Sequence, residues 1–239
     1  MQKISIGDNP FDYLIVDNFL DEETLKQVTS EFPSYDSEIW NCAYNNHIEK
    51  KKACNDWNKF TPNIYQLLYK MSSDKFTKEV ETLFGASNLI PDHGLHGGGL
   101  HIHKRGDKLN VHLDYSTHPK LKLKRVLNAI LYLTPDWDKS WGGGLQLWSH
   151  DDINNKPKEL ITTVENKYNR LVVFDVSGYS WHGFAEPINC PENINRQSAA
   201  VYFLKDEKDM SDRPRALYAP SKDQENDTEV LDLIQKRGK

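Results

Sequence analysis

The sequence predicts an α+β protein in which helices occupy the N-terminal part and a β-sandwich or jelly roll follows. Amphipathic helical patterns fill the first third of the 239-residue chain, whereas short β-like segments separated by Gly, Pro, Asn and Asp begin at Gly97. About eight strands within roughly a hundred residues are typical of a sandwich or a jelly roll. Because the helices precede the strands, we expect them to pack together on one sheet.

Three amphipathic patterns predict three helices. Each pattern spaces its apolar residues by three and four positions and has a boundary residue that caps or stops a helix. The expected helices extend from Asp21 to before Pro33, from Pro62 to about Met71, and from Ser73 or Asp74 to Gly85. A short strand is expected before them at Phe11–Leu20, and the polar segment Ser34–Lys59 is predicted to be irregular.

The β-like segments predict the strands of the second part. They lie near Leu100–His103, Asn110–Asp114, Arg125–Thr134, Gly144–Ser149, Glu159–Val164, Arg170–Val176, Ser180–Glu186 and Gln197–Leu204. We expect a single domain over residues 1–205, with a helical part at 1–96 and a β core at 97–205. Residues 206–239 are charged and poor in large apolar side chains, so we expect a tail with one short helix at Thr228–Lys236.

Composition excludes several classes of protein. The 30 basic and 35 acidic residues give a formal net charge of −5, whereas nucleic-acid-binding domains normally have a strong basic excess. No apolar segment approaches the ~20 residues that span a bilayer. The three cysteines, Cys42, Cys54 and Cys190, cannot all pair, which favours a reducing compartment. We therefore expect a cytoplasmic monomer or homodimer without nucleic-acid or membrane partners.

Two residues of one predicted strand suggest a metal site. His112 and Asp114 are two positions apart, so a strand places both side chains on the same face. His182 is the best candidate for a third ligand. Two histidines and one carboxylate form the facial triad of non-haem iron(II) sites, which leaves positions open for substrate and oxygen. Zinc could use the same ligands. Six of the nine histidines lie between residues 93 and 118, and of these we expect His112 alone to bind the metal.

Two further strands place polar side chains among apolar ones. Arg196 and Ser198 share one face of their strand, and Asn128 and Tyr132 share one face of another. Arginine binds carboxylates bidentately, and a neighbouring hydroxyl can add a hydrogen bond. These faces predict a polar pocket. The alternative is that Arg196 lies at the surface and Tyr132 is a core aromatic residue.

Seven sequence elements follow one another in a recognisable order between residues 97 and 204. They are His103–Asp114, Arg125, Ile130–Trp137, Gly142–Leu147, Asn169–Phe174, His182–Gly183 and Arg196–Ser198. This series resembles the iron(II)- and 2-oxoglutarate-dependent oxygenases, and among them the prolyl 4-hydroxylase-like branch. The resemblance implies a double-stranded β-helix, which is a jelly roll, with the iron at one mouth and the N-terminal helices packed on one sheet.

The resemblance also implies a role for each candidate residue. His112, Asp114 and His182 correspond to the iron ligands of the family and are the candidate catalytic and metal-binding residues. Arg196 corresponds to the basic residue, Tyr132 to the tyrosine and Ser198 to the small polar residue that hold the distal carboxylate of 2-oxoglutarate in the family. His103 stands at a position where family members have a tyrosine that contacts the co-substrate. These four residues are the 2-oxoglutarate-binding candidates.

The implied activity is that of a 2-oxoglutarate-dependent dioxygenase, a hydroxylase. Its cofactors would be Fe(II), 2-oxoglutarate as co-substrate and O2, with ascorbate as an accessory reductant. We expect hydroxylation of an unactivated C–H bond of a prolyl residue in a peptide or protein, with decarboxylation of 2-oxoglutarate to succinate. The alternatives are the same chemistry on a small molecule, such as a free amino acid or a sugar-like metabolite, a zinc-dependent hydrolase, or a jelly-roll binding module without catalysis.

Overall fold

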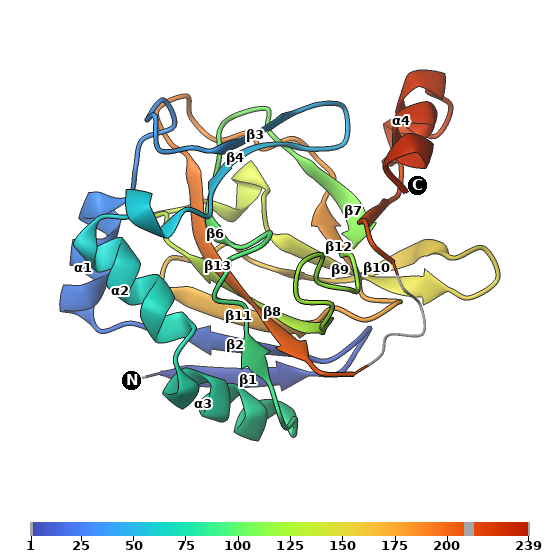
Figure 1. Ribbon diagram of the computed structural model, residues 1–239. Helices are drawn as coiled ribbons and strands as arrows, with labels where there is room; N and C mark the ends of the chain where they lie inside the picture. The colour runs from blue at the N-terminus through green and yellow to red at the C-terminus, as the bar shows by residue number, and fades with distance from the viewer. Residues whose placement is uncertain (1, 208–212, 239) are drawn as a thin grey trace.

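A computed structural model describes residues 2–207 and 213–238, and its strands form two facing sheets (Figure 1). The strands of the larger sheet are, in spatial order, β1 (Lys3–Gly7), β2 (Tyr13–Asp17), β11 (Arg170–Asp175), β8 (Lys124–Tyr132), β13 (Arg196–Lys205), β6 (Gly99–His103), β4 (Lys50–Cys54) and β3 (Cys42–Asn45), while β5 (Ile90–Pro91) pairs with β13. The strands of the smaller sheet are, in spatial order, β10 (Lys156–Val164), β9 (Leu145–Asp151), β12 (Trp181–Phe184), β7 (Leu109–Leu113) and β14 (Leu217–Tyr218).

Apolar side chains from both sheets meet between them. Leu147 of the smaller sheet packs in one cluster with Val172 and Phe174 of the larger sheet. All pairings between named strands in the described residues are antiparallel. This arrangement is the expected jelly roll, or double-stranded β-helix, and its open end holds the cavity described below.

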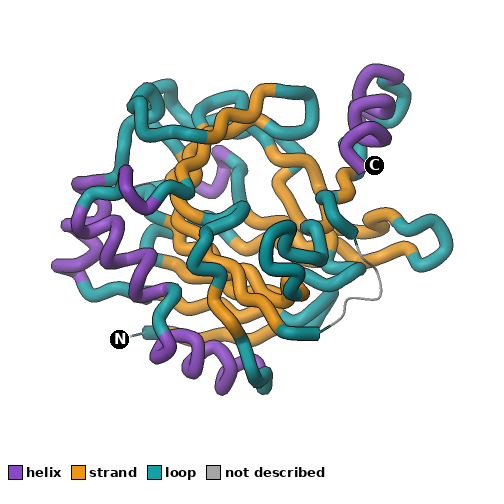
Figure 2. The backbone as a smooth tube through the Cα atoms, viewed as in Figure 1, coloured by secondary structure: helices purple, strands orange, loops and turns teal. Residues whose placement is uncertain are grey.

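Three helices cover the outer face of the larger sheet, as the coloured tube in Figure 2 shows. They are α1 (Glu22–Glu31), α2 (Pro62–Met71) and α3 (Asp74–Phe84). The Asp21 side chain accepts a hydrogen bond from the Thr24 amide at 2.9 Å, and Ser73 caps α3 in the same way. Gly85 ends α3 in the left-handed conformation, at φ +61°. The α+β class and the packing of the N-terminal helices on one sheet are confirmed.

The prediction of an irregular segment at Ser34–Lys59 is wrong. This segment forms the β3–β4 hairpin, followed by a short 3-10 helix at Trp57–Lys59. β4 is the lysine-rich sequence KKKAC, whose polar residues hide the alternation expected of a strand. It becomes a strand because it pairs with β6, an interaction between distant parts of the chain that local pattern does not report. The exposed strand β1 was missed for a similar reason.

Residues 213–238, which we assigned to a charged tail, lie against the smaller sheet. β14 pairs with β7, and the Asn110 amide donates to the Gln224 side chain at 2.7 Å. The predicted helix is present as α4 (Thr228–Gly238). None of the helices in the described ranges is long and apolar enough to cross a lipid bilayer.

Candidate active site

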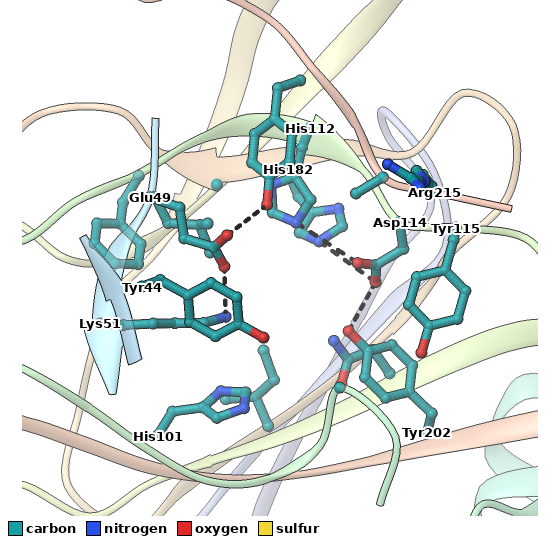
Figure 3. A pocket seen from close by; sticks show the side chains of 18 of the residues that line it. Tyr44, Glu49, Lys51, His101, His112, Asp114, Tyr115, His182, Tyr202 and Arg215 are labelled. Atoms are coloured by element: carbon teal, nitrogen blue, oxygen red, sulfur yellow. Dashed lines mark hydrogen bonds and ion pairs between the residues drawn. The ribbon is translucent and has the colours of Figure 1, made fainter. Parts of the chain in front are cut away.

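The paired strands β7 and β12 bring the predicted metal ligands together. Their register places His182 directly opposite His112, and the two ring centroids are 4.4 Å apart. Asp114 follows β7 immediately; its carboxylate oxygens lie 3.6 Å from His112 Nε2 and 3.8 Å from His182 Nε2. One ligand atom from each residue lies within 4.8 Å of the others, and all three residues are buried (Figure 3).

Hydrogen bonds to the backbone orient both imidazoles. His112 Nδ1 donates to the Asn110 carbonyl oxygen at 2.9 Å, and His182 Nδ1 donates to the Ser180 carbonyl oxygen at 2.8 Å. Because Nδ1 carries the proton in each ring, Nε2 keeps its lone pair for a metal. Burial, together with the neighbouring His112, lowers the pKa of His182 to about 4, so this ring is neutral near pH 7.

The carboxylate of Asp114 is ionised and held in place. Burial would raise its pKa, but the neighbouring imidazoles of His112 and His182 and the positive charge of Arg125 lower it well below the usual range. The Tyr202 hydroxyl donates to Asp114 Oδ2 at 2.9 Å. The Arg125 guanidinium lies 3.4 Å from the Tyr202 ring centroid and 3.7 Å from that of Tyr115. Two imidazoles and one carboxylate on a single wall are the donor set that iron(II) takes in a facial triad.

A second group of predicted residues lies on β13 and β6. The register pairs Arg196 with His103, and both side chains are buried. Arg196 Nε donates to the Gly143 carbonyl oxygen at 2.7 Å, while its guanidinium packs 4.8 Å from the Phe184 ring. No carboxylate in the described part of the chain forms an ion pair with Arg196.

His103 has unused hydrogen-bonding capacity. Neither of its ring nitrogens has a partner in the described residues. Burial, together with the charge of Arg196, lowers the pKa of His103 well below its usual value, so the ring is neutral. The buried guanidinium of Arg196 has no carboxylate partner among the described residues, and the neighbouring His103 ring has no hydrogen-bond partner there. The carboxylate of a ligand would supply hydrogen-bond acceptors to both side chains. The pair fits the distal carboxylate of 2-oxoglutarate.

The other two predicted co-substrate residues differ in their surroundings. Ser198 lines the cavity beside Arg196. Tyr132 lies in the apolar cluster between the sheets, and the Arg196 guanidinium is 5.1 Å from its ring centroid. The Tyr132 hydroxyl is buried without a hydrogen-bond partner in the described residues. A contact of either residue with 2-oxoglutarate stays a prediction.

Both groups open into one cavity of about 440 Å³. The sequence analysis missed much of its lining, including Tyr44, Glu49 and Lys51 from the β3–β4 hairpin, Tyr218 from β14 and Arg237 from α4. His96 and His101 also line it. The one local signal was the i, i+2 spacing of Glu49 and Lys51, which puts both side chains on one face of a strand.

Glu49 connects these missed residues. It accepts a hydrogen bond from the Tyr218 hydroxyl at 3.2 Å and forms ion pairs with Arg237 at 2.8 Å and Lys51 at 3.1 Å. Burial opposes ionisation, but the two cations outweigh it and lower the pKa of Glu49 to about 2. The Tyr218 ring stacks on His112, with centroids 5.1 Å apart. The C-terminal segment therefore contacts a predicted metal ligand directly.

Known proteins resemble this chain in sequence and in fold. Residues 98–204 match the model of the 2OG-Fe(II) oxygenase superfamily. The chain is 26% identical over 203 residues to the prolyl 3-hydroxylase OGFOD1 of Mus musculus. The aligned region covers 84% of this chain and 34% of that protein. The chain thus spans about a third of the length of this curated relative.

Two solved structures have a similar fold. The prolyl-4-hydroxylase of Pseudomonas putida superposes with a TM-score of 0.56 at 21% identity, covering 81% of this chain and 92% of that one. HygX of Streptomyces hygroscopicus, solved with nickel, 2-oxoglutarate and hygromycin B, gives a TM-score of 0.53 at 12% identity, covering 81% and 82%. At these identities the superpositions show the fold, whereas the sequence match covers the triad and Arg196. Residues 98–204 thus carry the sequence pattern of the 2OG-Fe(II) oxygenase superfamily, and the chain has a double-stranded β-helix similar to that of the prolyl-4-hydroxylase structure.

Proposed function

We propose that this protein is an iron(II)- and 2-oxoglutarate-dependent dioxygenase that hydroxylates a prolyl residue in a peptide or protein. The observation that carries the proposal is that the triad and the Arg196–His103 group, which has no carboxylate partner among the described residues, open into one cavity. The similarity to a prolyl 3-hydroxylase over most of this chain supports the choice of a prolyl substrate. A zinc hydrolase would use the triad but would leave Arg196 and His103 without a function.

Each group of residues has a distinct task. Iron(II) and 2-oxoglutarate, when bound, supply the oxidising power, because decarboxylation to succinate drives the transfer of one oxygen atom from O2 to the substrate. His112, Asp114 and His182 would hold the metal from one wall of the cavity. Arg196 and His103 orient the co-substrate by its far carboxylate. The apolar walls at Ile130, Leu145 and Phe184 exclude water from that end.

We also propose a cytoplasmic location, with the protein acting as a monomer or a homodimer. The three cysteines are present as free thiols, which supports a reducing compartment. Fractionation of cells that express a tagged chain tests the location, and light scattering of the purified protein tests the oligomeric state.

Anaerobic spectroscopy tests the proposed chemistry. Adding Fe(II) and 2-oxoglutarate without oxygen should produce a weak visible charge-transfer band, which oxygen should bleach while succinate forms. Asp114→Ala should abolish both the band and the turnover. Arg196→Ala should retain the metal but require far more 2-oxoglutarate. Wild-type turnover in Asp114→Ala would contradict the triad, and unchanged affinity for 2-oxoglutarate in Arg196→Ala would contradict the assignment of that residue.

A further inference from the structure

The cavity differs in charge from the rest of the molecule. Among the described residues, five arginine and lysine side chains line it against two carboxylates, so three formal positive charges are in excess there, whereas the whole chain has a net charge of −5. The cations are Lys51, Arg125, Arg196, Arg215 and Arg237, and the carboxylates are Glu49 and Asp114. The lining histidines His96, His101 and His103 are buried or half-buried, which lowers their pKa values, so they add no positive charge near pH 7.

This positive excess persists when the proposed cofactors are bound. Iron(II) adds two positive charges and 2-oxoglutarate adds two negative charges, so the sum is unchanged. Arg196 would then be neutralised by the co-substrate carboxylate. The remaining excess belongs to the part of the cavity beyond the metal, where a substrate has to enter.

Arg215 is the cation with the most capacity for a ligand. It lies at the rim, exposed, on the segment that leads into β14, and it has no hydrogen bond or ion pair to any other described residue. In Figure 3 it lies close to Asp114 and Tyr115, while Lys51 lies on the other side of the triad. Lys51 shares its one carboxylate, Glu49, with Arg237, so two cations compensate a single negative charge.

We propose that the cavity selects substrate segments with acidic side chains next to the residue that is oxidised. A partly enclosed cavity with one sign of charge focuses the electrostatic field and raises the local concentration of oppositely charged ligands. A basic segment would be repelled by the same groups. The identity of the oxidised residue as proline rests on the proposed function above, whereas the selection for negative charge rests on the lining residues.

Binding of three labelled peptides tests the inference directly. The peptides have equal length and one central proline, and differ in having Glu, Gln or Lys at both flanking positions. Fluorescence anisotropy is measured on the enzyme loaded with Mn(II) and 2-oxoglutarate. We expect the Glu peptide to bind at least ~10-fold more tightly than the Gln peptide at low salt and the Lys peptide to bind weakest, with the differences shrinking at high salt. Equal affinities, or no binding of the Glu peptide, would overturn the inference.

A pair of variants separates the cavity from the overall charge. Arg215→Gln should weaken binding of the Glu peptide by about 3- to 5-fold, the size expected for one exposed ion pair, and should leave the Gln peptide unaffected. Lys26→Gln makes the same change in net charge at an exposed position on α1 outside the cavity and should have no effect. Equal losses in both variants would mean that bulk charge, not the cavity, attracts the peptide.

Product analysis separates this inference from the proposed function. With Fe(II), 2-oxoglutarate and O2, mass spectrometry reports whether the bound Glu peptide gains one oxygen atom. Tight, Arg215-dependent binding without oxidation would contradict the prolyl substrate but retain the selection for negative charge. Oxidation of the Glu and Gln peptides with equal kcat/KM would support prolyl chemistry and overturn the charge selection.

Discussion

At the scale of single residues, the predicted metal ligands are held by contacts on several sides. Both histidines donate through Nδ1 to the carbonyl oxygen two positions earlier, so strand geometry itself presents Nε2 to the cavity. Among the described residues, no backbone group hydrogen-bonds the Asp114 carboxylate, which accepts instead from the Tyr202 hydroxyl. Hydrogen bonds of this kind commonly change metal affinity 10- to 100-fold when they are removed.

We therefore predict that Tyr202→Phe weakens metal binding by about 10-fold. The variant removes the hydroxyl from Asp114 but keeps the ring against which Arg125 stacks, so the fold should be unchanged. Titration with Mn(II), followed by the quenching of tryptophan fluorescence or by calorimetry, measures the affinity. Tyr168→Phe removes a hydroxyl that bonds Thr29 outside the cavity and serves as the matched control. If both variants bind Mn(II) as the wild type does, Tyr202 does not position the ligand.

Sequence could predict the triad but not this supporting contact. His112 and Asp114 are two positions apart in one strand, and the family motif then marks His182. Tyr202 is 88 positions from Asp114, and its contact joins β13 of the larger sheet to the residue that follows β7 of the smaller sheet. The roles of Glu49, Tyr218 and Arg237 were hidden for the same reason, since each comes from a different element.

At the scale of elements, the close approach of β7 and β12 sets the spacing of the two histidines. The two backbones lie close together at Gly183, directly after His182. A Cβ atom at Gly183 would lie 2.8 Å from the Asn110 carbonyl oxygen and 2.9 Å from that of Leu109. These contacts are with backbone, so the strand itself would have to move.

Gly183→Ala should therefore disturb both stability and the metal site. We expect a loss of about 1–3 kcal/mol in the free energy of unfolding, as in other overpacked sites, because β12 must shift away from β7. His182 would move with its strand, so Mn(II) affinity should fall by at least ~10-fold. Urea denaturation and Mn(II) titration measure the two effects.

A matched control is available on the loop before β12. An added Cβ atom at Gly178 would meet no atom within 4 Å, so Gly178→Ala should leave both stability and Mn(II) affinity near the wild-type values. If Gly183→Ala behaved like Gly178→Ala, the close contact between the strands would not set the position of His182.

Most elements could be predicted from sequence because they carry a local signal. The helices have caps at Asp21 and Ser73, and strands such as β8 and β13 are long and apolar. The β3–β4 hairpin lacks such a signal, because its exposed lysines are compatible with a loop. It is stabilised by its pairing with β6 and by the ion pairs of Glu49, both of which appear only after the chain has folded.

At the scale of the whole molecule, the metal site connects parts of the chain that are far apart in sequence. The ligands come from β7, the residue after it, and β12, while β14 covers His112 through Tyr218. An unfolded chain cannot present these groups together. Metal binding should therefore be coupled to the stability of the fold as well as to activity.

Mn(II) should raise the thermal stability of the protein for this reason. A ligand that binds the native state alone stabilises it by about 2.7 kcal/mol at a hundred times its Kd. For a chain of this size, that free energy corresponds to a rise in Tm of roughly 5–10 °C. Differential scanning fluorimetry with and without Mn(II) measures the shift, and EDTA should reverse it. His182→Ala removes one ligand and should lose most of the shift, whereas Lys26→Gln should keep it. An equal rise in Tm in His182→Ala would place the stabilising metal at a site other than the triad, since a triad that lacks one ligand cannot bind Mn(II) with unchanged affinity.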